Sequence, residues 1–136
     1  MKKKQPPEHK GLLKKTEVPH RPLVFSFKYF DASDAEICPT TFRENYTQAL
    51  MQRLRDISSW TAQEFVTKPH KSIRNHSHDW PKTTRPKGFV NLNEQLQSCV
   101  GWQFQISSNK HGRVHGIIID NVFYVIWLDH NHQLYS

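Results

Sequence analysis

The C-terminal end of the chain carries side chains that could transfer protons and bind a phosphate. Arg113 and His115 stand at the start of one apolar run, and His130, His132 and Tyr135 follow the end of the next. Histidine suits acid and base roles because its pKa lies near neutrality. Arginine keeps its positive charge, and its planar guanidinium matches the geometry of phosphate. These are the residue types that metal-free cleavage of RNA requires.

Such cleavage needs three groups: a base for the 2′-hydroxyl, a cation for the charged phosphorane, and an acid for the 5′-oxygen. We expect Arg113 to hold the scissile phosphate. The proton-transfer partners are expected among the other polar side chains of this region: His115, His130, His132 and Tyr135. Two plainer interpretations stay open. Arg113 could pair with Asp129 at the surface, and each histidine could be a solvated or core ring.

These side chains depend on a hairpin to position them. Residues 113–119 and 122–129 are apolar runs joined by Asp120-Asn121, a pair that suits a two-residue type I′ turn. An uninterrupted ladder from that turn places Arg113 opposite Leu128. Arg113 and the histidine two residues later then share the one face that is polar away from the turn.

Two helices joined by a short loop are expected upstream. A capping box at 41–44 predicts a helix that ends near 58–59, and a second box at 61–64 predicts a shorter one. The second helix should end near Thr67, because the residue before Pro69 disfavours the α region.

Strands are expected at 23–30 and 101–106, with a basic loop at 68–87 and one helical turn ending at Gln97. The predicted fold is therefore an α+β two-layer sandwich of order β-α-α-β-β-β. In it, an antiparallel sheet carries the αα-hairpin on one face.

Positive charge is concentrated in two segments of a chain whose net charge is +7. Residues 1–28 carry +6 and residues 67–89 carry +5. The proline-rich and lysine-rich residues 1–22 predict a flexible basic arm, and residues 23–136 a single domain. Such a distribution favours a polyanionic partner, although a solvated surface has the same pattern. The expected nucleic-acid contacts are Lys68, Lys71, Arg74, Lys82, Arg85 and Lys87.

Two further interpretations use the same residues. The clusters at 76–79 and 129–132 contain nitrogen and oxygen ligands of the kind zinc accepts, but neither matches a known metal motif, so no metal or cofactor is expected. The chain could also bind nucleic acid or protein without catalysis. Trp60 or Trp80 would then stack on bases or, more simply, pack in the core.

The stretch WQFQISSNKHGRVHGIIIDNVFYVIWLDHNH resembles the RelE/ParE-like superfamily of toxins, as does the element order over residues 23–132. Aromatic alternation, an arginine opening the next strand and an acidic turn carry the likeness. The resemblance implies a ribosome-associated mRNA endonuclease, RNA or the ribosome as partner, and an acidic antitoxin covering the basic surface. It also implies Arg113 as the phosphate contact. Many members carry Lys or Glu on the strand at 101–106, where this chain has only Gln103 and Gln105. Side chains of the basic loop could replace them: Lys71, Arg74, His76 and His78.

The remaining features favour a cytoplasmic protein. Cys38 and Cys99 are far apart in the sequence and are expected to be reduced thiols. No apolar stretch approaches the roughly 20 residues that span a membrane, and the basic start has no hydrophobic signal region.

Overall fold

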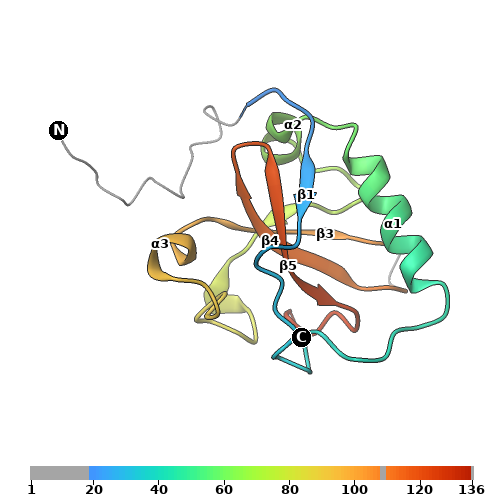
Figure 1. The fold of residues 1–136 in the computed structure, drawn as a ribbon, viewed down its shortest axis with the longest axis vertical. Helices are drawn as coiled ribbons and strands as arrows, with labels where there is room; N and C mark the ends of the chain where they lie inside the picture. The colour runs from blue at the N-terminus through green and yellow to red at the C-terminus, as the bar shows by residue number, and fades with distance from the viewer. Residues whose placement is uncertain (1–18, 108–109, 136) are drawn as a thin grey trace.

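The computed structural model describes residues 19–107 and 110–135 as an α+β fold around an open five-stranded mixed sheet (Figure 1). The strand order is β1-β5-β4-β3-β2. The elements are β1 (Val24–Ser26), α1 (Tyr46–Ile57), α2 (Ala62–Thr67), β2 (His76–Ser77), the 3₁₀ helix η3 (Trp80–Lys82), α3 (Glu94–Gln97), β3 (Gly101–Gln105), β4 (Arg113–Ile119) and β5 (Val122–Asp129).

The sequence predicted an antiparallel sheet, but the sheet is mixed. β1 runs parallel to β5, whereas β2–β3, β3–β4 and β4–β5 are antiparallel. The direction of β1 is fixed at its start. There Leu23 N–H donates to the Trp60 carbonyl (2.9 Å) and Val24 N–H to the Asn121 carbonyl (3.0 Å). β1 and β5 therefore begin at the same end of the sheet. The predicted strand at 23–30 shrinks to three residues.

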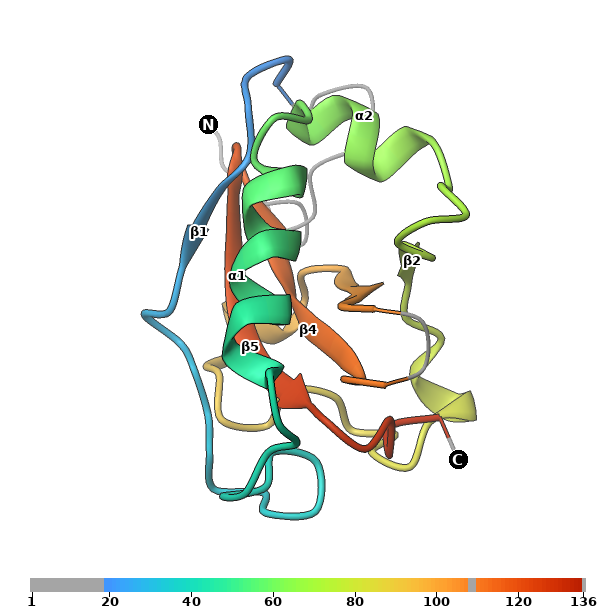
Figure 2. The ribbon, with the colours of Figure 1, turned by 90° about the vertical axis from the view of Figure 1, so that its right-hand side faces the viewer.

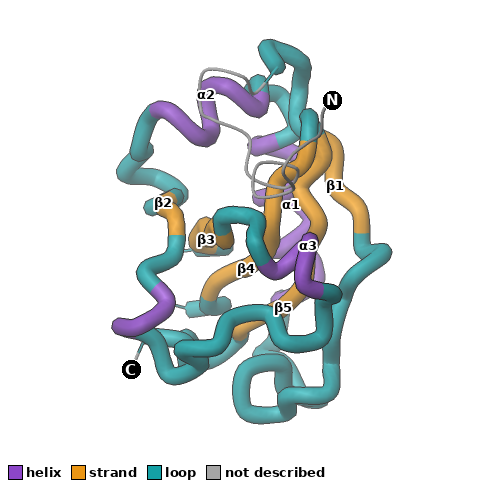
Figure 3. Tube along the Cα trace, turned by 90° about the vertical axis from the view of Figure 1, so that its left-hand side faces the viewer, coloured by secondary structure: helices purple, strands orange, loops and turns teal. Residues whose placement is uncertain are grey.

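Different layers cover the two faces of the sheet. α1 and α2 cover one face (Figure 2), where Leu54 and Phe65 pack with Phe104 and Phe123 in one apolar cluster. Coil segments and α3 lie over the opposite face (Figure 3), where Ile117 and its neighbours form a second cluster. The predicted αα-hairpin layer is present, but the sheet is buried on its other face as well.

The two predicted capping boxes have different outcomes. At α2 the box forms, since Glu64 N–H donates to Thr61 Oγ1 (3.0 Å) and Thr61 N–H donates to Glu64 Oε1 (2.9 Å). At 41–44 it does not, and α1 begins only at Tyr46. In the same segment, the Arg43 N–H donates to the His130 ring nitrogen Nε2 (3.0 Å). That bond ties the segment to the end of β5.

A β-bulge interrupts the β4–β5 ladder and changes which residues share a face. Pairing is regular from the turn to Gly116, which lies opposite Val125, and shifts by one residue between Gly116 and His115, which lies opposite Trp127. Arg113 consequently lies opposite Asp129 and not Leu128 as predicted. Because a shift of one residue reverses the faces, Asp129 joins the face of Arg113 while Leu128 packs toward the helices.

The hairpin turn also differs from the prediction. Asp120 has a positive φ of 60°, and Asn121 does not, so the turn is not type I′, which needs positive φ at both central residues.

Residues 19–22, assigned from the sequence to the basic arm, contact the domain. Pro22 bridges to Thr61, and the Arg21 guanidinium lies 2.6 Å from an Asp120 carboxylate oxygen. The rest of the predicted arm lies outside the described residues. None of the helices at 19–107 or 110–135 has the length and apolar character needed to cross a bilayer.

Candidate active site

A cleft of about 880 Å³ opens at the β2 edge of the sheet, and positively charged or neutral side chains line it. The segment 69–76 forms one wall, β3 and β4 contribute one residue each, and the C-terminal segment closes the far side. None of the described lining residues is acidic. They are Pro69, His70, Lys71, Arg74, Asn75, His76, Gln103, Arg113, His132 and Tyr135.

Asn75 holds the first wall in place. Its amide nitrogen donates to the carbonyls of Phe65 (2.7 Å) and Lys68 (2.9 Å), and its oxygen accepts from His70 N–H (2.8 Å). These bonds fix the chain between α2 and β2. Arg74, in the left-handed region at φ 48°, lies within this turn, and its side chain reaches the cleft. The first part of the basic loop expected at 68–87 therefore forms an ordered wall of the cleft.

Arg113 is a buried cation without a carboxylate partner among the described residues. It is only 4% exposed, and its one hydrogen bond is a long one, from Nη1 to the Gly112 carbonyl (3.3 Å). Burial, together with the charge of Arg74, lowers the pKa of its guanidinium. A buried charge in this state is costly unless an anion compensates it. The surface ion pair with Asp129 that the sequence left open is not formed.

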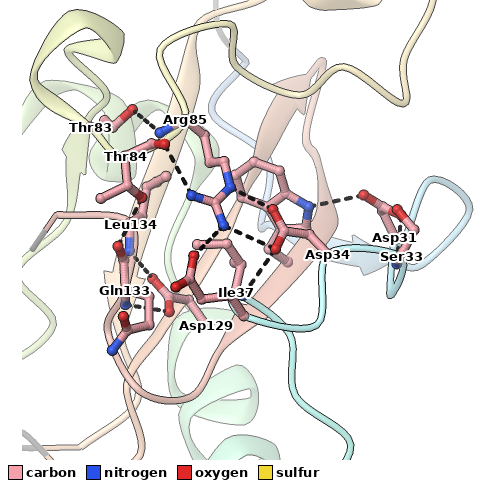
Figure 4. A network of polar contacts seen from close by, with 12 residues as sticks. Asp31, Ser33, Asp34, Ile37, Thr83, Thr84, Arg85, Asp129, Gln133 and Leu134 are labelled. Atoms are coloured by element: carbon pink, nitrogen blue, oxygen red, sulfur yellow. Dashed lines mark hydrogen bonds and ion pairs between the residues drawn. The ribbon is translucent and has the colours of Figure 1, made fainter.

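Asp129 is unavailable because other groups use its oxygens. Gln133 N–H donates to Oδ1 (2.7 Å) and Leu134 N–H to Oδ2 (3.0 Å) (Figure 4). Oδ2 also lies 2.8 Å from His115 Nε2. Burial alone would raise the pKa of Asp129. The hydrogen bonds from His115 and the two backbone amides outweigh it and hold that pKa below its ordinary value.

A chain of contacts leads from Asp129 to the cleft. His115 Nδ1 lies 3.0 Å from His78 Nε2, and His78 Nδ1 lies 2.9 Å from the Tyr135 hydroxyl. Burial lowers the pKa of His78 to about 2 and also lowers that of His115, although Asp129 opposes the shift there. Burial raises the pKa of Tyr135. At neutral pH these four contacting side chains are therefore a carboxylate, two neutral imidazoles and a phenol.

Several cleft residues carry a buried polar atom without a hydrogen-bond partner. Among the described residues, seven buried side-chain atoms have no hydrogen-bond partner, and three belong to cleft residues. They are His70 Nε2, Gln103 Oε1 and Arg113 Nε. Buried polar groups are nearly always paired, so these three unpaired atoms are costly to the free protein.

Three of the five predicted catalytic residues line the cleft, and two do not. Arg113, His132 and Tyr135 line the cleft. His115 is fully buried behind it and cannot touch a substrate. His130 lies away from the cleft, with its ring edge-on to Phe42. His130 therefore does not face this cleft, and its Nε2 accepts the Arg43 N–H (3.0 Å).

The predicted nucleic-acid contacts also divide. Lys71 and Arg74 line the cleft, and Lys68 borders a smaller cavity beside it. Lys82 pairs with Asp79 (3.6 Å). Arg85 is held by Asp34 (Figure 4) and by Glu36. It also lines a second cavity together with Lys87. Arg85 is thus committed to internal ion pairs and is not a free phosphate contact.

Sequence reasoning missed the link through His78, and it missed Gln103 and His70 as cleft residues. From the sequence, His78 was considered only as a loop side chain that could replace the missing Lys or Glu of the strand at 101–106, or as a zinc ligand. Its contact with His115 joins residues far apart in the chain, for which no local pattern exists. The period-two alternation of β3 could have indicated Gln103, because it faces away from its buried neighbours Trp102 and Phe104.

The alternative interpretations have structural outcomes too. In the described part of the chain, no group of three or more His, Cys, Asp or Glu side chains is arranged so that it could hold a metal ion, the two zinc-like clusters included. Trp60 packs against His70 and Trp80 against Phe89, so both tryptophans are partly buried in the domain.

No family model matches this chain, and neither the curated proteins nor the solved structures contain a significant match. The site is therefore interpreted from its own geometry.

Proposed function

We propose that this protein binds RNA in the cleft and cleaves it by acid/base chemistry without a metal ion. The observation that carries the proposal is the buried, unpaired guanidinium of Arg113 in the same cleft as Tyr135 and His132. A phosphodiester is the natural complement of such a group, because its oxygens match the guanidinium fork.

The reaction is a transfer within the RNA backbone. One of Tyr135 and His132 takes the proton of the 2′-hydroxyl, whose oxygen attacks phosphorus while the bond from phosphorus to the 5′-oxygen breaks. The other gives a proton to the departing 5′-oxygen. Arg113 stabilises the charged phosphorane between these events. The products carry a 2′,3′-cyclic phosphate and a 5′-hydroxyl.

Charge near His132 suits the role of acid in the complex. In the free protein, burial and the neighbouring Arg113 lower the pKa of His132. A bound phosphodiester brings a negative charge into the same cleft, which favours the protonated imidazole. Lys71 and Arg74 extend the positive surface along the strand. RNA affinity is therefore expected to fall steeply as salt rises.

The finer proposals follow from the resemblance to RelE/ParE-like toxins. The first strand, the αα-hairpin and the final three-strand meander support a RelE-like arrangement, with β2, η3 and α3 as additions. An mRNA or the ribosome would then be the target, and an acidic antitoxin would cover the cationic cleft. The two free, buried cysteines favour a reducing compartment such as the cytoplasm.

A cleavage assay in the presence of a chelator tests the enzyme. Arg113→Ala and Tyr135→Phe should each slow cleavage by about 10²-fold or more. Arg55→Ala and Tyr124→Phe are the matched controls, because neither residue lines the cleft. RNA carrying a 2′-deoxy sugar at the cleaved position should resist. Equal rates for the wild type and the cleft variants, or cleavage of the deoxy substrate, would refute the enzyme proposal.

A second candidate is binding of RNA or an acidic protein without cleavage. The unpartnered Gln103 Oε1 and His70 Nε2 favour it, since neither atom has a role in the chemistry above. The same assay discriminates. RNA that is bound in a salt-dependent, Arg113-dependent way, and recovered intact, would support the binding function in place of cleavage.

A further inference from the structure

We propose that Asp129, His115 and His78 form a proton relay that makes the hydroxyl oxygen of Tyr135 the general base of the cleft. The inference rests on the proposed function for its substrate, and on the hydrogen-bond geometry for its direction. It assigns the base and acid that the cleavage scheme left open: Tyr135 takes the proton of the 2′-hydroxyl, and His132 supplies the proton for the 5′-oxygen. His78, His115 and Asp129 are positioning residues, because none of them lines the cleft.

The direction of the relay follows from its buried end. Asp129 accepts two backbone N–H groups and has a lowered pKa, so it is an ionised carboxylate that can only accept. The nitrogen beside it, His115 Nε2, must therefore carry a proton. A neutral imidazole has one donor and one acceptor, so His115 Nδ1 is the acceptor.

The same reasoning passes through His78 to the cleft. His78 Nε2 faces the acceptor Nδ1 of His115 at 3.0 Å and must be protonated, which leaves His78 Nδ1 as an acceptor. The Tyr135 hydroxyl, 2.9 Å away, donates to it. Asp79 N–H donates to the Tyr135 oxygen from the backbone (3.2 Å). The phenol thus has its proton engaged inward, and its remaining lone pair is available to a ligand in the cleft.

Every proton is accounted for along the four side chains of the relay. When Tyr135 accepts the substrate proton, its own proton moves to His78 Nδ1, and the proton on His78 Nε2 moves to His115 Nδ1. His115 becomes an imidazolium in contact with the Asp129 carboxylate, and Tyr135 and His78 end neutral. The 5′-oxygen takes its proton from His132. One proton then passes through water from the relay to His132, which restores the relay and His132 to their starting states.

The charged groups near the relay favour this placement of the positive charge. Arg113 and His76 act on His115 and disfavour its protonation, whereas Asp129 favours it by direct contact. His78 has no carboxylate contact among the described residues, and its ring lies 6.1 Å from that of His76. His115 is therefore the position in the relay at which the carboxylate can balance a positive charge.

Nitrogen NMR of the free wild-type protein tests the direction without RNA and without a mutation. At pH 7, the ring nitrogens of His78 and His115 should show neutral imidazoles protonated at Nε2. An Nδ1–H tautomer at either residue, or an imidazolium at pH 7, would overturn the relay. Because this readout needs no substrate, it holds whether or not the protein cleaves RNA.

Kinetics test whether the relay acts in catalysis. In His78→Gln the amide oxygen can still accept the Tyr135 hydroxyl but cannot take its proton. We expect kcat to fall about 10²-fold with KM little changed, and the acidic limb of the pH profile to move. His20→Gln is the matched control, since His20 is exposed and does not line the cleft. A fully active His78→Gln would overturn the relay even if RNA is cleaved. Absence of wild-type cleavage, together with the predicted tautomers, would refute the cleavage proposal and leave the hydrogen-bond order standing.

Discussion

At the scale of single residues, burying the Arg113 guanidinium lowers the stability of the fold, and the same side chain is proposed to bind a phosphate. Its side chain is nearly as buried as the aliphatic core, yet its Nε has no partner, and no described carboxylate forms an ion pair with it, although the charge of Asp129 acts on it. Most buried arginines are paired, because removing a guanidinium from water is expensive. A residue that lowers stability and is nevertheless placed in a cleft is expected to serve a ligand.

This conflict gives a prediction for Arg113→Met, which keeps the apolar stem and removes the charge. The free protein should become more stable by about 1–2 kcal/mol in urea denaturation, since an uncompensated buried cation is replaced by an apolar group. Inorganic phosphate should raise the melting temperature of the wild type but not of the variant. A variant that is less stable, and still stabilised by phosphate, would contradict the assignment. Arg55→Met, at an exposed site, controls for the loss of one charge.

At the scale of secondary-structure elements, the β4–β5 bulge creates the relay. A regular ladder would direct Asp129 toward the helices, and His115 would lie opposite Ile126. The bulge instead brings Asp129 beside Arg113 and within 2.8 Å of His115. Gly116 permits it, because a Cβ there would lie against the Tyr124 carbonyl and 2.6 Å from the Phe123 ring.

The bulge predicts a large effect for Gly116→Ala. The added methyl group must displace the backbone of β5, so we expect a loss of about 2–4 kcal/mol in the free energy of unfolding. The loss should be accompanied by a weaker contact between His115 and Asp129, visible as a change in the His115 ring nitrogens by NMR. Ser72→Ala, at an exposed position, is a suitable control. Unchanged stability in Gly116→Ala would mean that the ladder tolerates a side chain at this position.

Elements with local signals could be predicted from the sequence, and those set by distant contacts could not. The capping box at Thr61, the end of α1 and the strands β3 to β5 follow from residues within a few positions. The segment before α1 is tied to His130, 87 residues from Arg43, and β2 forms only because β3 offers an edge. The bulge leaves both apolar runs unchanged, so periodicity does not reveal it.

The candidate site follows the same division. Arg113, His132 and Tyr135 could be predicted because the strand and the segment after it carry them directly to one end of the sheet. His115 and His130 have the same local signals but lie in the interior, because the bulge and the Arg43 contact decide their surroundings. Residue type identified candidates, whereas exposure to the cleft depended on the tertiary fold.

At the scale of the whole molecule, several histidines are kept neutral by burial. The pKa values of His78, His115, His130 and His132 are all lowered from 6.5. In the unfolded chain the same rings return to about 6.5 and take up protons below that pH. The unfolded state then binds more protons than the folded state, so the free energy of unfolding must decrease as the pH falls through this range.

The resulting prediction is a stability that is nearly constant above pH 7 and falls between pH 6.5 and 5. Each histidine that stays neutral contributes a slope of about 1.4 kcal/mol per pH unit once its unfolded counterpart is protonated. Asp129 does not account for this window, because its lowered pKa makes its contribution disappear only below about pH 4. Urea denaturation at pH 7.5, 6.5 and 5.5 measures the effect, and Tyr135→Phe should retain it because the histidines stay buried. Equal free energies of unfolding at pH 7.5 and 5.5 would mean that the pKa values of these rings are not lowered in the folded protein, which would contradict the neutral imidazoles that the relay requires.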